Sequence, residues 1–243
     1  MPKIGIVSQA RMTSTRLPGK VLMTAMGNTV LEHHLNRLAW SGIPVYIATS
    51  TNSADRAITS LAMRLGIPYH CGDEHNVLER YYECATKFEL DIIIRVTSDC
   101  PLIDGHLISA GLKEYHQFGD KNVYYSNTIQ RTFPRGLDFE IFSIDLLRTA
   151  YQNASEESDK EHVTPYIHQN KSGKVKMHHF IDDEDHSDLR WTLDTKDDWN
   201  LLKKLFEDHQ VASLEYASIL RIIDKHPELA TINSHVNQKE IKS

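Results

Sequence analysis

The chain has 243 residues, 40% of them hydrophobic and 25% charged, which is the composition of a globular protein large enough to bury a core. It carries 27 Lys and Arg residues against 33 Asp and Glu residues, for a formal net charge of -6 at pH 7. This balance excludes a broad basic face of the kind that nucleic acids and anionic membranes require, so any polyanion must be bound locally by a few cations.

Short apolar runs alternate with amphipathic segments in the first half of the chain. The apolar runs predict strands at residues 4–7, 44–48 and 91–96. Apolar residues at helical spacing predict helices at residues 29–38, 54–65 and 76–88. Strands that alternate with helices of this length favour an α/β, Rossmann-like fold, with a mostly parallel sheet that is covered by helices.

The pattern is less regular in the second half. Strands are predicted at residues 124–128, 137–142, 175–180 and 189–193. Helices are predicted at residues 144–153, around 162–169 and at 196–206, where Thr195 and Asp198 have the spacing of a capping box. The tail after Ala230 is polar and is expected to fray. Because no repeat or low-complexity linker interrupts the chain, we expect residues 1–243 to form a single domain.

A segment rich in cations follows the first predicted strand. Residues 9–20 read QARMTSTRLPGK, and ligands of open parallel sheets bind beyond the carboxyl ends of strands, where this segment is expected to lie. Its three cations, Arg11, Arg16 and Lys20, could neutralise a polyphosphate, and the hydroxyl groups between them add donors. The alternative is a solvated surface turn. The segment lacks the GxxxxGK[ST] pattern of a Walker loop, which disfavours ATPase chemistry.

The cysteines and the apolar runs bear on the compartment of the protein. The three cysteines, Cys71, Cys84 and Cys100, are odd in number and have no CxxC spacing, which disfavours a disulfide framework or a zinc knuckle. No basic head with a long apolar stretch opens the chain, and no apolar run reaches the length of a membrane span. We therefore expect a cytoplasmic protein.

Seven segments, in family order along the chain, resemble motifs of the cytidylyltransferases that activate acidic sugars. They are QARMTSTRLPGK (9–20), GDEHNVLERY (72–81), RVTSDCPLID (95–104), SNT (126–128), FPRGLD (133–138), EHVTPY (161–166) and LRWTLDT (189–195). The resemblance spans roughly residues 1–206. It extends to the acylneuraminate and 3-deoxy-manno-octulosonate enzymes, and it is closest to the branch typified by the spore coat polysaccharide biosynthesis protein F.

This resemblance implies the fold of the nucleotide-diphospho-sugar transferases. It further implies a nucleotide-binding half at about 1–123, a smaller acceptor-binding and dimerisation lobe at about 124–206, and a helical C-terminal extension and tail at 207–243. The implied reaction transfers CMP from CTP to a sugar acid, with release of pyrophosphate, for polysaccharide biosynthesis. The leading acceptor is a nonulosonic acid, and a neutral or phosphorylated acceptor is the open alternative. The implied assembly is a homodimer.

Two carboxylates resemble the metal ligands of this family. Nucleotidyl transfer usually requires Mg²⁺ (or Mn²⁺) to neutralise charge on the phosphates, and this cation prefers oxygen ligands. Asp99 lies just past the strand at 91–96, and Asp194 precedes the predicted helix at 196–206. The alternatives are a turn residue for Asp99 and a helix cap for Asp194. The resemblance implies that Arg11, Lys20 and Asp99 are catalytic.

The remaining expected site residues fall within the matching motifs or follow predicted strands. Those expected to contact CTP are Gln9, Ala10, Arg11, Ser14, Arg16, Lys20, Thr49, Asp73, Asn76, Val77, Arg80, Thr97 and Ser98. Those expected to contact the acceptor are Arg135, Asp138, Glu140, His162 and Arg190. For Arg80 the alternative is an exposed helix cation. Arg135 or Arg190 could hold a carboxylate bidentately, and either could equally be structural.

Two other functions fit parts of the sequence. A glycosyltransferase that uses a nucleotide sugar would normally carry a DxD motif after the central strand, where this chain has TSD at 97–99, and it would not need three cations in the loop. A nucleotide-sensing scaffold would not need both carboxylates. The histidine pair at 33–34 lies in a predicted helix without the HExxH spacing, and the adjacent side chains of the pair at 178–179 point apart on a predicted strand. We therefore expect no metal site on histidines.

Overall fold

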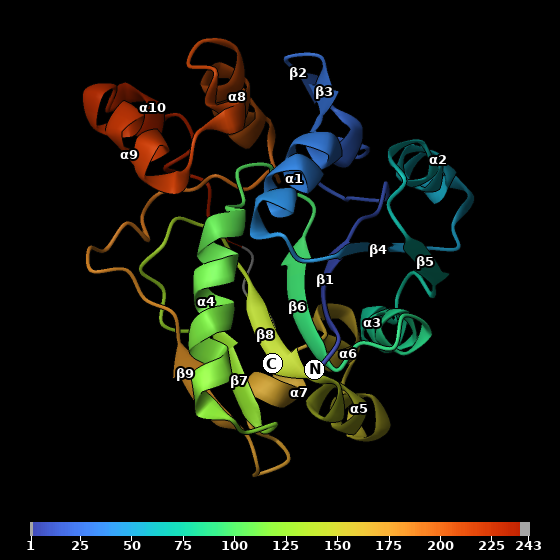
Figure 1. The fold of residues 1–243 in the computed structure, drawn as a ribbon. Helices are drawn as coiled ribbons and strands as arrows, with labels where there is room; N and C mark the ends of the chain where they lie inside the picture. Colours follow the sequence, from blue (N-terminus) through green and yellow to red (C-terminus); the bar gives the residue numbers. More distant parts are fainter. Residues whose placement is uncertain (1, 239–243) are drawn as a thin grey trace.

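The computed structural model describes residues 2–238 and contains a seven-stranded sheet in the order β5-β4-β1-β6-β8-β7-β9 (Figure 1). A short hairpin, β2 (Thr24–Ala25) with β3 (Asn28–Thr29), stands apart from it. The strands of the large sheet are β1 (Ile4–Gln9), β4 (Val45–Ser50), β5 (Tyr69–Gly72), β6 (Ile92–Thr97), β7 (Val123–Ser126), β8 (Glu140–Ser143) and β9 (Lys176–His179).

The direction of the strands determines where a ligand can bind. β1 runs parallel to β4 and β6, β4 to β5, and β7 to β9, whereas β8 is antiparallel to both of its neighbours. The carboxyl ends of β1, β4, β5, β6 and β7 therefore lie at one edge of the sheet, the edge toward which the arrowhead of β6 points in Figure 1. Ligands of open α/β sheets bind at this edge. The expected α/β fold with a mostly parallel sheet is confirmed, and β7, β8 and β9 continue the same sheet.

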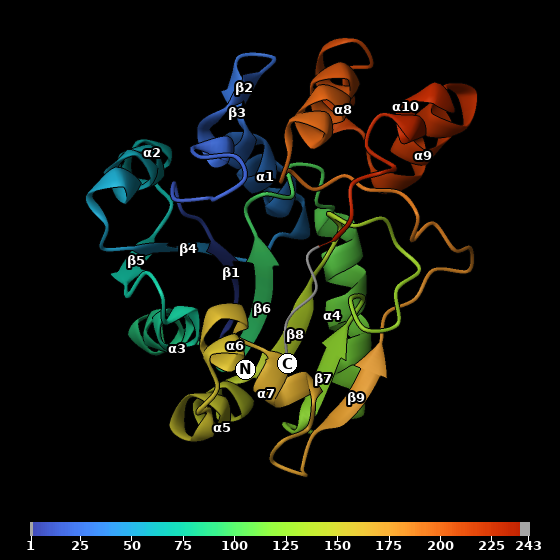
Figure 2. The same ribbon diagram turned by 180° about the vertical axis from the view of Figure 1, so that it is seen from behind.

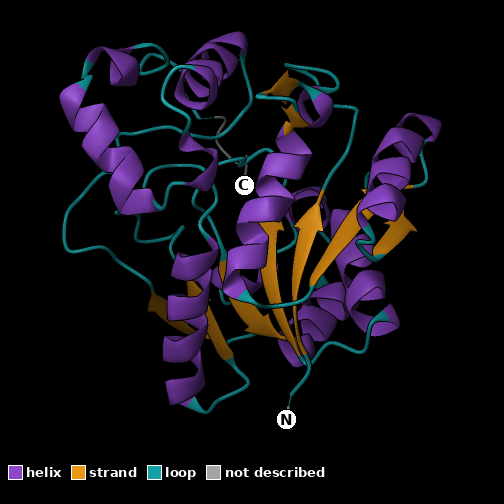
Figure 3. Ribbon diagram, turned by 45° about the horizontal axis from the view of Figure 1, so that its top comes forward, coloured by secondary structure: helices purple, strands orange, loops and turns teal. Residues whose placement is uncertain are grey.

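Helices cover both faces of the sheet, as Figures 1 and 2 show from opposite sides. One face carries α1 (Val30–Leu38), α2 (Arg56–Leu65) and α4 (Gly105–Phe118). The other face carries α3 (Val77–Lys87), α5 (Ile144–Asn153), α6 (Glu157–His162) and α7 (Pro165–His168). Beyond the carboxyl edge lie α8 (Lys196–Glu207), α9 (Tyr216–Lys225) and α10 (Glu228–Thr231) (Figure 3). Within residues 2–238, each helix is too short or too polar to span a bilayer.

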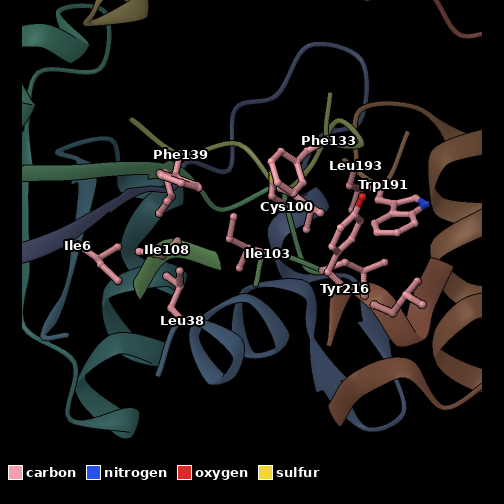
Figure 4. Packing of buried hydrophobic residues seen from close by; sticks show 14 of the residues in the cluster. Ile6, Leu38, Cys100, Ile103, Ile108, Phe133, Phe139, Trp191, Leu193 and Tyr216 are labelled. Carbon is pink, nitrogen blue, oxygen red and sulfur yellow. The ribbon is translucent and has the colours of Figure 1, made fainter. Parts of the chain in front are cut away.

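The core forms because adjacent strand residues face opposite sides of the sheet. On β1, Ile6 packs into the cluster under α1 and α4, whereas Val7 packs into the cluster under α3 and α5. Figure 4 shows how the first cluster extends from Ile6 and Leu38 to Trp191 and Tyr216, next to the C-terminal helices. The C-terminal extension is thus anchored in the main core of the molecule.

The structure corrects two predicted elements of the second half. The segment 189–193 is not a strand, because its one β-bridge joins Arg190 to Arg135, and Gly136, at a φ of 108°, then turns the partner backbone away. The helix expected around 162–169 is divided into α6 and α7. Val163 adopts a φ of 72° between them, and Pro165 begins the second helix.

The structure also corrects the prediction that was made for the C-terminal tail. It was expected to fray after Ala230, yet α10 extends to Thr231 and Asn233 is only 2% exposed. Residues 239–243 lie outside the described residues.

Sequence patterns also did not predict α4, whose N-terminal turn is capped by Asp104.

The buried His34 of α1 ties β1 to the loop that follows β6. Its Nε2 lies 2.9 Å from Ser8 Oγ, and its Nδ1 lies 2.9 Å from the carbonyl oxygen of Cys100. Because a carbonyl oxygen only accepts, Nδ1 donates to it, and in the neutral ring Nε2 then accepts from the Ser8 hydroxyl. Burial lowers the pKa of His34 to about 4, against the opposing effect of the Cys100 carbonyl.

We expect the free energy of unfolding to fall by about 3 kcal/mol as the pH drops from about 6.5 to about 4. In this range His34 takes up a proton in the unfolded chain and not in the folded one, so its contribution is complete above pH 6.5 and decreases toward pH 4. Urea unfolding of the wild type and of His34→Gln across this range measures the effect. The variant should lack this part of the pH dependence, and parallel profiles would contradict the assignment.

Candidate active site

The segment 9–20, called the phosphate loop below, is folded back on itself and held from two sides. Gly19 N donates to Met12 O at 2.9 Å, and Gly19 has the left-handed φ of 70° that this turn requires. Met12 N donates to Asp55 Oδ1 at 2.7 Å, and Thr13 Oγ1 donates to Glu74 Oε1 at 2.6 Å. Because these two carboxylates follow β4 and β5, the phosphate loop is fixed at the carboxyl edge of the sheet.

Lys20, at the end of the phosphate loop, lies between the two carboxylates that were predicted as metal ligands. Its Nζ donates to Asp99 Oδ2 at 2.7 Å and to Asp194 Oδ1 at 2.8 Å, and the residue is 7% exposed. Burial opposes the charge on Lys20, but the two carboxylates outweigh it and raise the pKa of the ammonium group. At Asp99 burial likewise opposes ionisation, and Lys20 outweighs it to lower the pKa to about 2. Lys20 and Asp99 are therefore both charged at neutral pH.

Backbone contacts bring the two carboxylates together. Leu193 N donates to Asp99 O at 2.8 Å, which joins the loop after β6 to the segment before α8. The expected capping box is confirmed, with Thr195 as the N-cap of α8 and Asp198 as its partner. Since Thr195 caps the helix, the carboxylate of Asp194 is left to face Lys20.

Two arginines hold the other oxygen of Asp194. Its Oδ2 accepts from Arg16 at 2.9 Å and from Arg190 at 2.8 Å. The side chain of Arg190 is 5% exposed, and its remaining donors are also in use, since Nε donates to Asp198 at 2.8 Å and Nη1 to Gln238 at 2.7 Å. Arg190 was expected to contact the acceptor, and in the structure its guanidinium is occupied in supporting Asp194.

The pair Asp99 and Asp194 fits a divalent cation that arrives with its own ligands. Their oxygens converge on one cationic group, the Lys20 ammonium, so the site already accommodates positive charge. Within residues 2–238, no group of three or more His, Cys, Asp or Glu side chains could hold a metal ion. Mg²⁺ commonly takes one or two protein carboxylates and completes its shell with waters and substrate phosphates. The site has the donor set for this mode of binding.

On the side of β5, the expected nucleotide contacts build a compact loop. Arg80 is 1% exposed and donates to Asp73 O at 2.7 Å, so it is not an exposed helix cation. Burial is the main reason that its pKa is lowered. The carboxylate of Asp73 accepts from His75 N and Asn76 N, both at 2.7 Å, and the Asn76 side chain caps α3 at Glu79 N. Val77 is buried as the first residue of α3.

The ends of β1, β4 and β6 lie side by side beneath the phosphate loop. Thr97 pairs with Gln9, whose side-chain oxygen accepts from Arg95 at 3.3 Å. Thr49 is buried and donates to Asp55 at 3.2 Å, and the buried Ala10 and Ser98 continue the same layer.

Two loop residues are left with unused donors. The Arg11 guanidinium and the Ser14 hydroxyl make no hydrogen bond or ion pair with the part of the chain that the structure describes. Both are partly exposed at the carboxyl edge. They are therefore free to contact a ligand there.

On the acceptor side, one cation is unpaired. The Arg131 guanidinium holds Asp138, with contacts of 2.5 and 3.1 Å, whereas the Arg135 guanidinium makes no hydrogen bond to any residue between 2 and 238. Burial and the neighbouring Arg131 lower the pKa of Arg135. Asp138 attracts this half-buried group, but the donors of its guanidinium make no hydrogen bond within the described residues, which suits an anionic ligand.

The other expected acceptor contacts are more enclosed. Glu140 is 4% exposed, pairs with Arg95, and accepts from Tyr124 at 2.5 Å and from Thr164 at 2.6 Å. Each of its oxygens therefore has a protein partner. His162 is the partly buried last residue of α6 and also interacts with its surroundings.

Sequence reasoning missed four charged residues that hold the site. Asp55 and Glu74 fix the phosphate loop, Arg95 holds Gln9 and Glu140, and Arg131 holds Asp138. Glu74 and Arg95 lie inside the motifs at 72–81 and 95–104, so a signal was present. Their partners are far away in the chain, and local patterns do not reveal them.

The chain is similar to known proteins over nearly its whole length. A family model described as "Cytidylyltransferase" matches residues 4–241. The chain is 34% identical over 246 residues to an uncharacterised protein of Methanocaldococcus jannaschii, covering 100% of this chain and 98% of that protein. It is 28% identical over 242 residues to the spore coat polysaccharide biosynthesis protein SpsF of Bacillus subtilis, covering 95% and 98%.

The fold of the chain also matches a solved structure over its whole length. The structure of a cytidylyltransferase from Leptospira borgpetersenii matches with a TM-score of 0.90 and 31% identity, over 100% of both chains. The match extends over the phosphate loop, both carboxylates and the C-terminal extension, since each lies within the aligned chain. The chain belongs to the cytidylyltransferase family and is a CTP-dependent nucleotidyltransferase.

Proposed function

We propose that the enzyme transfers CMP from CTP to a sugar acid, in which the acceptor hydroxyl attacks the α-phosphate and pyrophosphate leaves. The acceptor is a nonulosonic acid and the product serves polysaccharide biosynthesis. The observation that carries the proposal is the Lys20 ammonium between Asp99 and Asp194. Two further guanidinium groups make no hydrogen bond or ion pair within residues 2–238: that of Arg11, in the same loop as Lys20, and that of Arg135, whose backbone bridges to Arg190. This arrangement suits a polyphosphate donor and an anionic acceptor.

On the donor side, the phosphate loop provides the charge that the triphosphate needs. Arg11 is free to form a bidentate contact with phosphate oxygens, and Arg16 and Lys20 exchange their carboxylate partners for phosphates. Lys20 is suited to this exchange, because its long side chain carries a compact charge on flexible bonds. Charge that accumulates on the departing pyrophosphate is then neutralised by groups already aimed at it.

Asp99 and Asp194 would hold Mg²⁺ or Mn²⁺ as part of the nucleotide complex. When bound, the ion neutralises phosphate charge and orients the α-phosphate for in-line attack. The role of the protein is to keep both carboxylates convergent, and Lys20 does so before the nucleotide binds by pairing with each of them. The enzyme is proposed to act as a homodimer.

On the acceptor side, Arg135 is the group proposed to bind the carboxylate of the sugar acid. It is half-buried, so a bound carboxylate would be partly shielded from water and held more strongly than at the surface. A glycosyltransferase function is not favoured, because TSD replaces the DxD motif at 97–99 and the family match is to cytidylyltransferases.

The first test is the substrate itself. Pyrophosphate release should be seen with CTP and a member of a panel of sialic, legionaminic and pseudaminic acids and 3-deoxy-manno-octulosonate, and it should depend on Mg²⁺ or Mn²⁺. UTP, GTP and ATP in place of CTP are the controls. Turnover with UTP or GTP and none with CTP would contradict the cytidylyl transfer, and turnover with neutral sugars alone would contradict the sugar acid.

Asp99→Asn should lower kcat by at least about 100-fold, because it removes a charge that acts on the phosphates in the transition state. The circular dichroism spectrum should be unchanged, since Asn fills the same space. Asp91→Asn, at the opposite end of β6, is the matched control and should retain normal turnover. Near-normal turnover of Asp99→Asn in the pyrophosphate assay would refute the metal assignment.

Arg135→Met should raise the KM for the acceptor by about 10-fold or more, as expected for the loss of a charge-assisted hydrogen bond. The KM for CTP should change little, because the substitution lies on the acceptor side. Arg148→Met, which removes an arginine of α5 paired with Asp145, is the control for the general loss of a cation. An unchanged acceptor KM in initial-rate measurements would exclude Arg135 as the carboxylate ligand.

A further inference from the structure

The C-terminal segment 232–238 returns from α10 to the edge of the candidate active site. Leu229 of α10 is buried in the main core, and Ile232 packs against the same cluster. These apolar contacts anchor the segment and direct the next residue, Asn233, inward, where it is 2% exposed. A buried asparagine side chain needs hydrogen-bond partners, because burying an unpaired amide lowers the stability of the fold.

Asn233 finds both of its partners in the segment that carries Asp194. Its Nδ2 donates to Arg190 O at 2.9 Å and to Asp198 Oδ1 at 2.8 Å. Asp198 is fully buried and also accepts from Arg190 Nε at 2.8 Å. Burial opposes the ionisation of Asp198, but Arg190 and Asn233 outweigh it and hold its pKa below the ordinary value. Asn233 is therefore one of the donors that hold the buried carboxylate of Asp198 in place.

Asp198 and Arg190 in turn determine where Asp194 lies. Asp198 Oδ2 accepts from Asp194 N at 2.9 Å, and Arg190 Nη2 donates to Asp194 Oδ2 at 2.8 Å. Gln238 Oε1 accepts from Arg190 Nη1 at 2.7 Å, so the C-terminal segment holds the guanidinium from a further side. A continuous line of contacts thus runs from Asn233 through Asp198 and Arg190 to Asp194.

We infer that Asn233 is a positioning residue of the active site, and that the segment 232–238 helps to hold Asp194 in the orientation that the site needs. The inference rests on the proposed function, in which Asp194 holds a divalent cation with the nucleotide. Without the Asn233 amide, Asp198 Oδ1 loses a donor and the Arg190 carbonyl loses its partner, so both can shift. Asp194 then loses its fixed orientation toward Asp99, although it is not itself changed. Residues that orient metal ligands in this way typically contribute 10- to 100-fold to metal affinity or activity.

The test measures how much Mg²⁺ tightens CTP binding, by isothermal titration calorimetry of the full chain with CTP in MgCl₂ and in EDTA. In the wild type, Mg²⁺ should lower the Kd for CTP. Asn233→Ala should reduce this gain by about 10-fold or more, while the Kd in EDTA stays within about threefold. Asn233→Ser, which keeps one hydroxyl donor, should recover part of the gain. Ser234→Ala is the matched control, because this neighbouring serine is exposed and its hydroxyl donates to Thr231 O of α10, away from Asp198 and Arg190.

The outcomes separate positioning from simple loss of stability. A structural role alone would weaken CTP binding equally with and without Mg²⁺, and this result, or an unchanged gain in Asn233→Ala, would overturn the inference. If Asn233→Ala lacks a cooperative unfolding transition, Gln238→Ala is tested in its place, because Gln238 is exposed and contacts Arg190. This variant should also reduce the gain in CTP affinity that Mg²⁺ gives, but to a smaller extent. If Mg²⁺ has no effect on the wild type, the metal part of the proposed function fails first and this inference fails with it.

Discussion

The arrangement of the site depends on one buried ammonium group. Lys20 lies between Asp99 and Asp194, two carboxylates that would repel each other if no cation stood between them. Its charge joins three parts of the chain: the phosphate loop after β1, the loop after β6, and the segment before α8. Because the pKa shifts of Lys20 and Asp99 both favour the charged forms, this contact persists at neutral pH and keeps the site assembled before any nucleotide enters.

Two outer groups of contacts keep these three segments in place. At the phosphate loop, Asp55 and Glu74 accept hydrogen bonds from its backbone and from a threonine hydroxyl, so a loop rich in cations is fixed by carboxylates from the neighbouring strand ends. At the other end of the site, Arg190 and Asp198 fix Asp194. The parallel order of β5, β4, β1 and β6 makes this possible, since it brings the ends of consecutive strands to the same edge.

The distribution of paired and unpaired charge agrees with a site for anions in a protein of net charge -6. Most charged side chains around the centre have protein partners, and the free guanidinium groups of Arg11 and Arg135 stand on the donor and acceptor sides. In buried ion pairs such as Arg95 with Glu140, each charge already faces an opposite charge of the protein. In the proposed function, the guanidinium groups of Arg11 and Arg135 are available to the ligand without the loss of a contact within the protein.

The features that depend on local periodicity or on ordered motifs could be predicted from the amino-acid order alone. These include the parallel α/β sheet, the position of the phosphate loop after β1, the capping box at Thr195 and the family. The sequence misread the segment 189–193 as a strand, because an apolar alternating run looks the same whether or not a partner strand is available. It also expected the polar tail to fray, although Asn233 is buried. The pairing of charges depends on how distant segments meet in the fold, as with Lys20 and Asp194, which are 174 positions apart. Such contacts form because the fold brings distant segments of the chain together, and local sequence patterns do not predict them.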